Sequence, residues 1–347
     1  MAEPHWLRLA TGSVCASLLL SIPSYANAQE AEEETIEVVR TKEDTKGIFS
    51  ATFENDFFVG EDDGYTNGFR FSYLSPEKRP PWPIRNIAHQ LPFFPEEGHK
   101  RYSLAFGQTM YAPGNLNSRT LIRDDRPYAG FLFGSIGMLN DTGKRLDNLQ
   151  LTLGVVGPAS GAEETQKFIH SAIDDTNPQG WNNQLENEPG FILTYERKWR
   201  SMYELSPFGW AIDATPHMGM SLGNIDTHAT TGVMFRIGQD LPSDYGPPLL
   251  RPNLPGSDFF IPTQTFGWYF FAGVDGRAVA RNIFLDGNTW RDSHSVDKKY
   301  FVGGLQAGIA MTYENTRIAY TYVMRSKEFH GQEDADTFGA ITLSYRF

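Results

Sequence analysis

Hydrophobic and polar residues alternate one by one over many short segments of this chain, each bounded by turn-forming residues. Residues 49–54 read FSATFE, residues 149–155 follow the same pattern, and the chain ends on it from Ile341 to Phe347. A period of two is the spacing of a β-strand, because successive side chains point to opposite faces. The pattern predicts twelve strands, at 47–58, 65–75, 101–110, 129–139, 147–157, 189–200, 207–221, 227–239, 265–282, 298–312, 315–325 and 336–347.

Alternating strands fit both a soluble β-sandwich and a membrane β-barrel. After the first residues no apolar run approaches the ~20 residues of a transmembrane helix, but a barrel needs only ~10-residue alternating segments. The strand count is even, and the terminal aromatic Phe347 resembles the assembly signal of bacterial outer-membrane barrels. We therefore expect an all-β fold: a single transmembrane antiparallel β-barrel of about twelve strands. The barrel-assembly machinery is the expected partner during biogenesis.

The N-terminus has the features of a secretory signal peptide. Arg8 supplies a charge, Leu9–Ile22 is an apolar run too short to span a bilayer, and Ala26-Asn27-Ala28 is a cleavage motif. Cys15 is the only cysteine and lies within this segment, so no disulfide or thiolate metal site is expected in the exported chain. The predicted divisions are a signal peptide at 1–28, an acidic disordered lead-in at 29–46 and a barrel domain at 47–347.

The charge of the chain excludes one class of partner. The formal net charge is −12, and Glu3 and Arg8 cancel within the signal peptide. An acidic exported chain lacks the basic surface that phosphate backbones require, which argues against nucleic acid as a partner.

One segment, residues 157–188, interrupts the β pattern and predicts a short helix. Ser160 and Glu163 have the spacing of a capping box, and helical periodicity continues to about Ile173. Gln166 and His170 are four residues apart and share one side of this helix. The helix is either part of a chemical site or a surface helix that covers a pore, and its spacing alone does not decide between them.

Strand parity places several polar clusters at the same end of the barrel as this helix. Asn55-Asp56 ends the first strand and Thr66-Asn67 begins the second, so these pairs are neighbours. Residues 124–128 precede the fourth strand, and we interpret them as an ion pair that locks a loop. A neutral histidine accepts a proton from water, and aspartate and amide oxygens bind Ca²⁺. Together with a lipid-facing wall, these groups suggest an esterase acting on a membrane lipid. The sequence has no G-x-S-x-G motif for a serine nucleophile.

At this point the chain resembles the lipid A 3′-O-deacylase (LpxR-like) family. The resemblance runs from about residue 47 to Phe347 and is densest up to Arg200. The runs that carry it are Glu54-Asn55-Asp56, Tyr65-Thr66-Asn67-Gly68, Asp125-Arg126-Pro127-Tyr128-Ala129-Gly130, Gly154–Ser160, Gln166 with His170, and Gly180-Trp181 with Gln184. Members are twelve-stranded outer-membrane barrels that remove the 3′-linked acyloxyacyl group of lipid A in a Ca²⁺-dependent reaction. The resemblance thus implies lipid A, or lipopolysaccharide in the outer leaflet, as substrate.

The resemblance also assigns roles to residues. It implies His170 as the base for a water nucleophile and Asp56, with Asn55, as part of a Ca²⁺ site. Thr66 and Gln166 match the other functional positions, so the resemblance implies a catalytic set of Asn55, Asp56, Thr66, Gln166 and His170. We expect His170 to lie outside any packed core, so that replacing it changes stability little.

The sequence departs from the family pattern in two places. An adjacent Lys-Arg pair in the second outer loop, suited to lipid A phosphates, is replaced by Asn117-Ser118-Arg119, which leaves Arg119 as the candidate substrate-binding residue. A glutamate and a tyrosine that follow the family's histidine are missing, and Asp174 and Asp175 are the candidates to replace the acid.

Other functions fit the same pattern of strands. An outer-membrane phospholipase is the alternative enzyme, and a small-solute channel or inert structural barrel is the alternative without catalysis. A channel requires an open lumen with the helix as a plug, whereas the esterase requires the helix over the outer wall. Two Pro-rich connections on the periplasmic side, 76–100 and 240–264, are longer than the short turns usual there.

Overall fold

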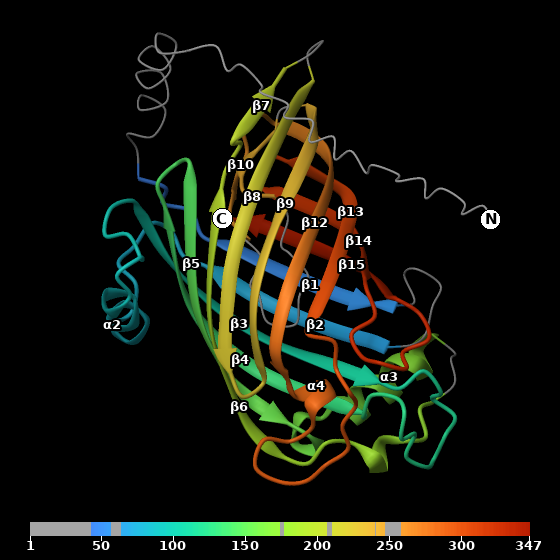
Figure 1. Cartoon of the computed structure of the whole chain (residues 1–347). Coiled ribbons are helices and arrows are strands. Elements are labelled where there is room, and N and C mark those ends of the chain that lie inside the picture. The colour runs from blue at the N-terminus through green and yellow to red at the C-terminus, as the bar shows by residue number, and fades with distance from the viewer. Residues whose placement is uncertain (1–42, 57–63, 174–176, 207–209, 240, 247–257) are drawn as a thin grey trace, which may run out of the picture. The chain divides into compact units, whose positions relative to one another are not determined.

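The computed structural model describes residues 43–56, 64–173, 177–206, 210–239, 241–246 and 258–347. Within them, twelve long strands form the wall of the unit Asp44–Phe347 (Figure 1). These are β1 (Ile48–Asn55), β2 (Gly64–Leu74), β3 (His99–Ala112), β4 (Ala129–Asp141), β5 (Arg145–Val156), β6 (Glu188–Trp199), β8 (Ala211–Gly223), β9 (Asp226–Gln239), β12 (Phe266–Asn282), β13 (Phe301–Tyr313), β14 (Thr316–Arg325) and β15 (Asp336–Arg346).

The strands close into an antiparallel barrel. Each long strand pairs with its neighbour along the chain, β1 pairs with β15, and β6 pairs with β8. The short strand β7 (Tyr203–Leu205) pairs with β8 beyond the end of its pairing with β6. Closure leaves no strand edge unpaired, which a barrel in lipid requires. The predicted twelve-stranded antiparallel barrel is confirmed, and the predicted strand bounds lie close to those observed.

The polarity of the wall is inverted relative to a soluble protein. In β1, Phe49 and Phe53 are exposed, whereas Ser50 and Thr52 are buried and face inward. The inward hydroxyls bond across the β1–β15 pair, Ser50 to Ser344 at 2.8 Å and Thr52 to Thr342 at 3.0 Å. Apolar groups outside and paired polar groups inside are the arrangement of a membrane barrel, not of a β-sandwich. Within the described residues, no helix is long and apolar enough to cross a bilayer.

The described parts of the connection between β9 and β12, residues 241–246 and 258–261, lie in the lumen at the end of the barrel that carries the C-terminus, which we call the terminal end. Its strands β10 (Ser243–Asp244) and β11 (Phe260–Ile261) pair with each other. Tyr245, Phe259 and Phe260 pack with inward residues of the wall such as Ile48. The Asp244 carboxylate accepts hydrogen bonds from Arg236, from Arg317 at 3.1 Å and from Tyr269 at 3.0 Å. These described parts of the long connection therefore form an internal plug.

A second core fills the lumen at the opposite end, which we call the loop end. The short helix α4 (Ile283–Asp286) places Phe284 on Tyr111, with ring centroids 4.1 Å apart. Beside it, buried Arg126 pairs with Asp336 at 3.0 Å and with Glu328 at 3.3 Å. The 124–128 segment is thus locked by ion pairs, as its sequence indicated. Packed groups at both ends weigh against an open channel.

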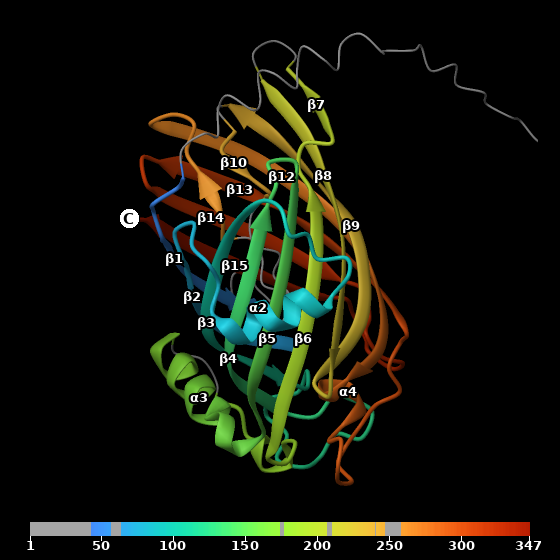
Figure 2. The same ribbon diagram turned by 90° about the vertical axis from the view of Figure 1, so that its left-hand side faces the viewer.

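The connection 76–100 contains a helix that the sequence analysis did not predict. Helix α2 (Trp82–Gln90) begins with proline near its N-terminus and buries Ile84 and Ala88. These side chains pack on outward residues of β4, β5 and β6, including Met138 and Leu149, so the helix covers the outside of the wall (Figure 2). The helix was not predicted because few apolar residues face the wall and because its prolines hide their helical spacing in the sequence.

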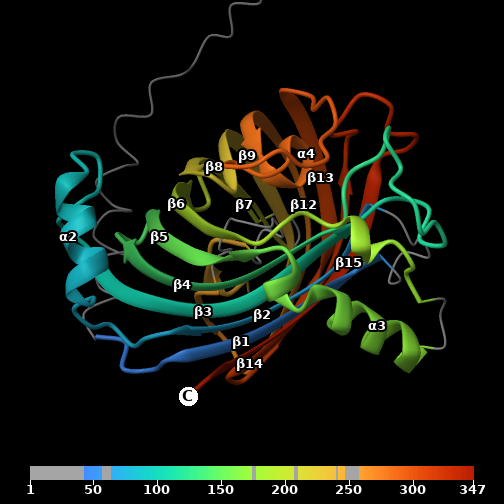
Figure 3. The same ribbon diagram turned by 90° about the horizontal axis from the view of Figure 1, so that it is seen from below.

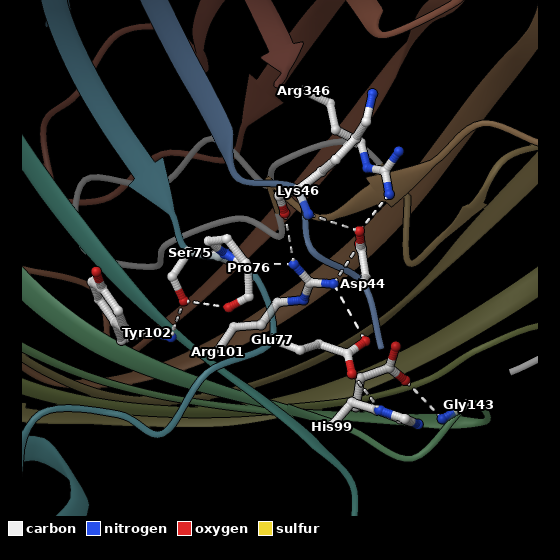
Figure 4. A network of polar contacts seen from close by, with 11 residues as sticks. Asp44, Lys46, Ser75, Pro76, Glu77, His99, Arg101, Tyr102, Gly143 and Arg346 are labelled. Atoms are coloured by element: carbon white, nitrogen blue, oxygen red, sulfur yellow. Dashed lines mark hydrogen bonds and ion pairs between the residues drawn. The ribbon is translucent and has the colours of Figure 1, made fainter. Parts of the chain in front are cut away.

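Polar contacts join the first strand, the last strand and β3 at the terminal end (Figure 4). The Asp44 carboxylate lies 2.5 Å from Arg101 and 2.5 Å from Arg346. Arg101 also donates to the Ser75 carbonyl at 2.9 Å and lies 3.5 Å from Glu77. We call this set the seam cluster, because it stands where β1 meets β15. Burial opposes ionisation of the Asp44 carboxyl, but the charges of Arg101 and Arg346 outweigh it, so its pKa lies below the ordinary 3.8.

Replacing Asp44 with asparagine should destabilise the barrel at neutral pH. Hydrogen bonds to charged groups contribute about 1.5–3 kcal/mol each, and the substitution removes the charge that both arginines contact. A lowered carboxyl pKa stabilises the fold above its unfolded value and loses this effect as the pH falls through the folded value. Urea unfolding in detergent should therefore show a deficit at pH 7 that shrinks below pH 3.8. Replacing the exposed Asp292 with asparagine is the control, and an equal deficit there would contradict the role of the seam cluster.

Candidate functional site

Helix α3 (Ala162–Ile173) lies outside the barrel wall at the loop end (Figures 1 and 3). It contacts β3 and β4, and the contact is closest at Gly130 of β4. A Cβ atom on Gly130 would lie 2.2 Å from both the Cβ of Ala162 and the Oγ of Ser160. Only glycine allows the helix to lie this close to the strand, and the helix therefore has the position expected of an esterase rather than a pore plug.

The helix does not begin with the predicted capping box. The 3-10 turn Pro158–Ser160 comes first, and Gly161 follows with a left-handed φ of 68°. The Ser160 hydroxyl donates to the Gly157 carbonyl at 2.6 Å, while Glu163 pairs with Lys167 at 2.5 Å. Ser160 fixes the turn that leads into the helix instead of capping it.

The inner side of α3 carries Ala162, Gln166 and His170 at steps of four residues, and all three are buried. Phe168, 74% exposed, points away from the wall. His170 is only 4% exposed, so the expectation that it lies outside a packed environment was wrong. The sequence could not reveal this, because helical spacing puts His170 on one face of the helix without showing what that face packs against.

Trp181 fixes the orientation of Gln166. Its indole Nε1 donates to Gln166 Oε1 at 2.8 Å, and the ring packs on Tyr128 with centroids 5.0 Å apart. An indole nitrogen is only a donor, so the amide oxygen must face it and the amide nitrogen must face away. That nitrogen is buried and has no hydrogen-bond partner among the described residues.

On the wall, Asn55 of β1 and Asn67 of β2 are direct cross-strand partners. Both share the outward side with exposed Phe53, yet Asn55 is 6% and Asn67 1% exposed. Asp56, which follows β1, is 2% exposed. Thr66 lies in β2 next to Asn67, but its side chain is outside the described part of the structure.

The structure gives less detail on the other candidate residues, which are Arg119, Asp174 and Asp175. Arg119 has an exposed side chain, and its carbonyl accepts from Asn183 Nδ2 at 3.1 Å, which links its loop to the segment after α3. Asp174 and Asp175 lie outside the described residues. In the described ranges, no group of three or more histidine, cysteine, aspartate or glutamate side chains could by itself hold a metal ion.

Some residues of this region were not singled out by sequence reasoning. Gln108 of β3 donates to the Ser160 carbonyl at 2.6 Å and so ties the turn before α3 to the wall. Gly130 and Trp181 were noted only as parts of family runs, without a role. The contacts of these residues join segments that lie tens of residues apart in the sequence. For Gln108 and Gly130 the available sequence signal was a polar or small residue at an outward-facing strand position.

Comparison with known proteins identifies the chain. A family model described as "Outer membrane protein LpxR" matches residues 13–347. The chain belongs to the LpxR family. Membership makes it a lipid A deacylase, a hydrolase of the bacterial outer membrane. A search of curated protein sequences gave no match.

One solved structure agrees with the fold. LpxR from Salmonella typhimurium is 18% identical, has a TM-score of 0.71, and aligns over 86% of this chain and 99% of its own. The β domain of the Bordetella autotransporter BrkA is 11% identical with a TM-score of 0.43, over 88% of this chain and 100% of that domain. The first likeness supports the barrel architecture, and the second carries no functional argument.

Adding a methyl group at Gly130 should disable the enzyme without unfolding the barrel. Gly130→Ala forces α3 away from β4, since the new Cβ would overlap Ser160 and Ala162. Gly134→Ala is the matched control on the same strand and side, where the nearest atom is the Ala105 oxygen at 3.9 Å. Mass spectrometry of lipid A should show at least a tenfold slower deacylation for Gly130→Ala only, because small displacements of catalytic groups cost about 10²-fold. Equal rates for both variants would show that the close contact is dispensable.

Proposed function

We propose that this chain hydrolyses the ester that links the acyloxyacyl group to the 3′ position of lipid A, with His170 as general base and Ca²⁺ as cofactor. The observation that carries this proposal is the buried polar side of α3 against the outer wall, which puts Gln166 and His170 between a helix and a lipid-facing surface. A lipid substrate reaches such a site from the membrane without entering the lumen.

The dimensions of the wall support contact between His170 and the end of β1. Eight residues separate Ala162, which sits over β4, from His170, and helix rise makes this about 12 Å. Three strand spacings separate β4 from β1, or about 14 Å. This length is enough for a helix that starts over β4 and crosses the strands to bring His170 near the end of β1. The burial of Asn55 on an otherwise exposed side supports this path.

The reaction follows from the chemistry of these groups. An imidazole nitrogen of His170 takes a proton from water, and the water oxygen bonds to the ester carbonyl carbon. The carbonyl oxygen becomes an oxyanion. When the tetrahedral intermediate collapses, the bond to the sugar oxygen breaks and His170 returns the proton to that oxygen. The products are a free 3′ hydroxyl and the acyloxyacyl acid.

The side chains at this site carry oxygen atoms of the types that bind calcium ions. Ca²⁺ binds carboxylate and amide oxygens and keeps some water or substrate ligands. Asp56 supplies a carboxylate and Asn55 an amide oxygen, and both are buried. A bound cation would supply positive charge to the developing oxyanion. Among the described residues no group of three or more acidic or histidine side chains stands ready to hold an ion, so amides, water and substrate oxygens would supply further ligands.

Other candidates would position the substrate. Gln166 cannot act as a base. Trp181 holds its amide oxygen, which leaves its amide nitrogen suited to orient water or the ester. Arg119, exposed in the loop before β4, is suited to a lipid A phosphate, since guanidinium groups bind phosphate well. Thr66 would contribute its hydroxyl.

Replacing His170 should abolish deacylation while the barrel still forms. His170→Gln keeps a polar side chain of similar size, which matters because His170 is buried; His170→Ala removes it altogether. Loss of a general base costs about 10²–10⁴-fold in rate, and lipid A mass spectrometry measures this. Exposed His89 of α2 provides the control His89→Gln, which should keep the wild-type rate. Deacylation by His170→Gln at the wild-type rate would remove histidine from the mechanism; loss of phospholipid chains instead would favour the phospholipase.

Chelation should stop the reaction reversibly. Excess EDTA is expected to halt release of the acyloxyacyl acid, and Ca²⁺ in excess of the chelator should restore it. Asp56→Asn removes the charge of the expected carboxylate ligand and should need far more Ca²⁺ for the same rate. Full activity in EDTA would show that no dissociable metal takes part.

A further inference from the structure

Asn67 has a side chain that the fold buries without using. It is 1% exposed, and neither its amide oxygen nor its amide nitrogen has a hydrogen-bond partner among the described residues. Burying an amide with no partner costs roughly 1–3 kcal/mol by mutational measure. A buried amide without a partner therefore indicates a ligand or substrate that binds to it during the reaction.

The surroundings of Asn67 indicate where that partner binds. Its cross-strand neighbour is Asn55, so the two amides stand side by side on the outward side of the wall. On its other side it pairs with Met110 of β3, which packs with Ala162 at the start of α3. Asn67 therefore lies between the wall and the helix that carries Gln166 and His170.

Some buried polar groups on the inward side of the wall are satisfied by one another. Ser72, on the same strand but facing inward, donates to Asp258 at 2.7 Å. Gln150 of β5 donates to the Thr152 hydroxyl at 3.0 Å. The lumen thus satisfies these polar groups with one another, whereas the amide at the outer site is left with both atoms unused.

We propose that Asn67 is a further residue of the active site, with two roles. Its Oδ1 would add an amide ligand to the cation at Asn55 and Asp56, and its Nδ2 would donate to the ester carbonyl oxygen as that oxygen becomes negative. This inference rests on the proposed function. It deepens that proposal by giving the ion a third protein ligand from a second strand, and the oxyanion a fixed donor.

Asn67→Leu tests both roles, because leucine has a similar size but no polar atoms. Removing an unpartnered buried amide should leave the thermal midpoint of the calcium-free protein unchanged or higher. The CaCl₂ concentration that gives half of the calcium-induced rise in midpoint should increase about 10–100-fold, as for lost interactions around metals. At saturating CaCl₂, kcat for lipid A in detergent micelles should fall about 10²–10³-fold, as for a lost oxyanion donor.

Asn67→Asp separates the two roles. Aspartate keeps an oxygen ligand and adds charge, so half-saturation with CaCl₂ should return to or below the wild-type concentration. It has no amide N–H, so kcat should stay low. This pattern, calcium binding restored without catalysis, is one that a merely structural residue would not produce.

Thr109→Val is the matched control. Thr109 of β3 is buried, its hydroxyl also lacks a partner, and it faces the lumen instead of α3. Its substitution should leave calcium binding and kcat unchanged. Asn67→Leu with wild-type calcium half-saturation and kcat would overturn the inference. If wild-type protein itself neither deacylates lipid A nor responds to CaCl₂, the proposed function has failed instead, so the two failures are distinguishable.

Discussion

The site of this enzyme depends on one steric contact, the meeting of a helix and a strand at Gly130. A barrel wall in lipid must show apolar side chains, so polar groups on the outer side of that wall need cover. Helix α3 supplies the cover because Gly130 has no side chain to keep it away from the strand. Gln108 then fixes the turn before the helix, and Trp181 fixes the side-chain amide of Gln166. The lumen, filled by aromatic residues at both ends, is left to stabilise the scaffold.

Most of the fold could be predicted from the sequence, because each strand of a membrane barrel alternates between apolar and polar residues. One rule holds along each strand: apolar side chains face outward and polar side chains face inward. Two examples are the segments Phe49 to Glu54 and Ile341 to Phe347. Pairing between sequential strands then follows from topology, and with it the adjacency of Asn55 and Asn67. The helix around His170 was also evident, since it breaks the alternation.

The connections and the burial of individual groups could not be predicted in the same way. Helix α2 has prolines at its start and a narrow apolar stripe, and Tyr245 and Phe259 are buried by wall residues over a hundred positions away. His170 is buried by contacts between segments, which no local pattern encodes. Asn67 was visible as part of a motif, but only the structure shows its register with Asn55 and its unpartnered amide. The side chain of Thr66 lies outside the described part of the structure, and its role stays a prediction.

The seam cluster has a consequence for how the chain folds. Asp44 and Arg346 are separated by 302 positions, so their contact closes nearly the whole chain into a loop. Contacts of such long range form late, because the entropy of loop closure opposes them until the intervening strands are in place. The first strand must therefore stay unpaired on one edge until the last has been made. An exposed strand edge can pair with another chain, so the barrel is open to aggregation during that interval.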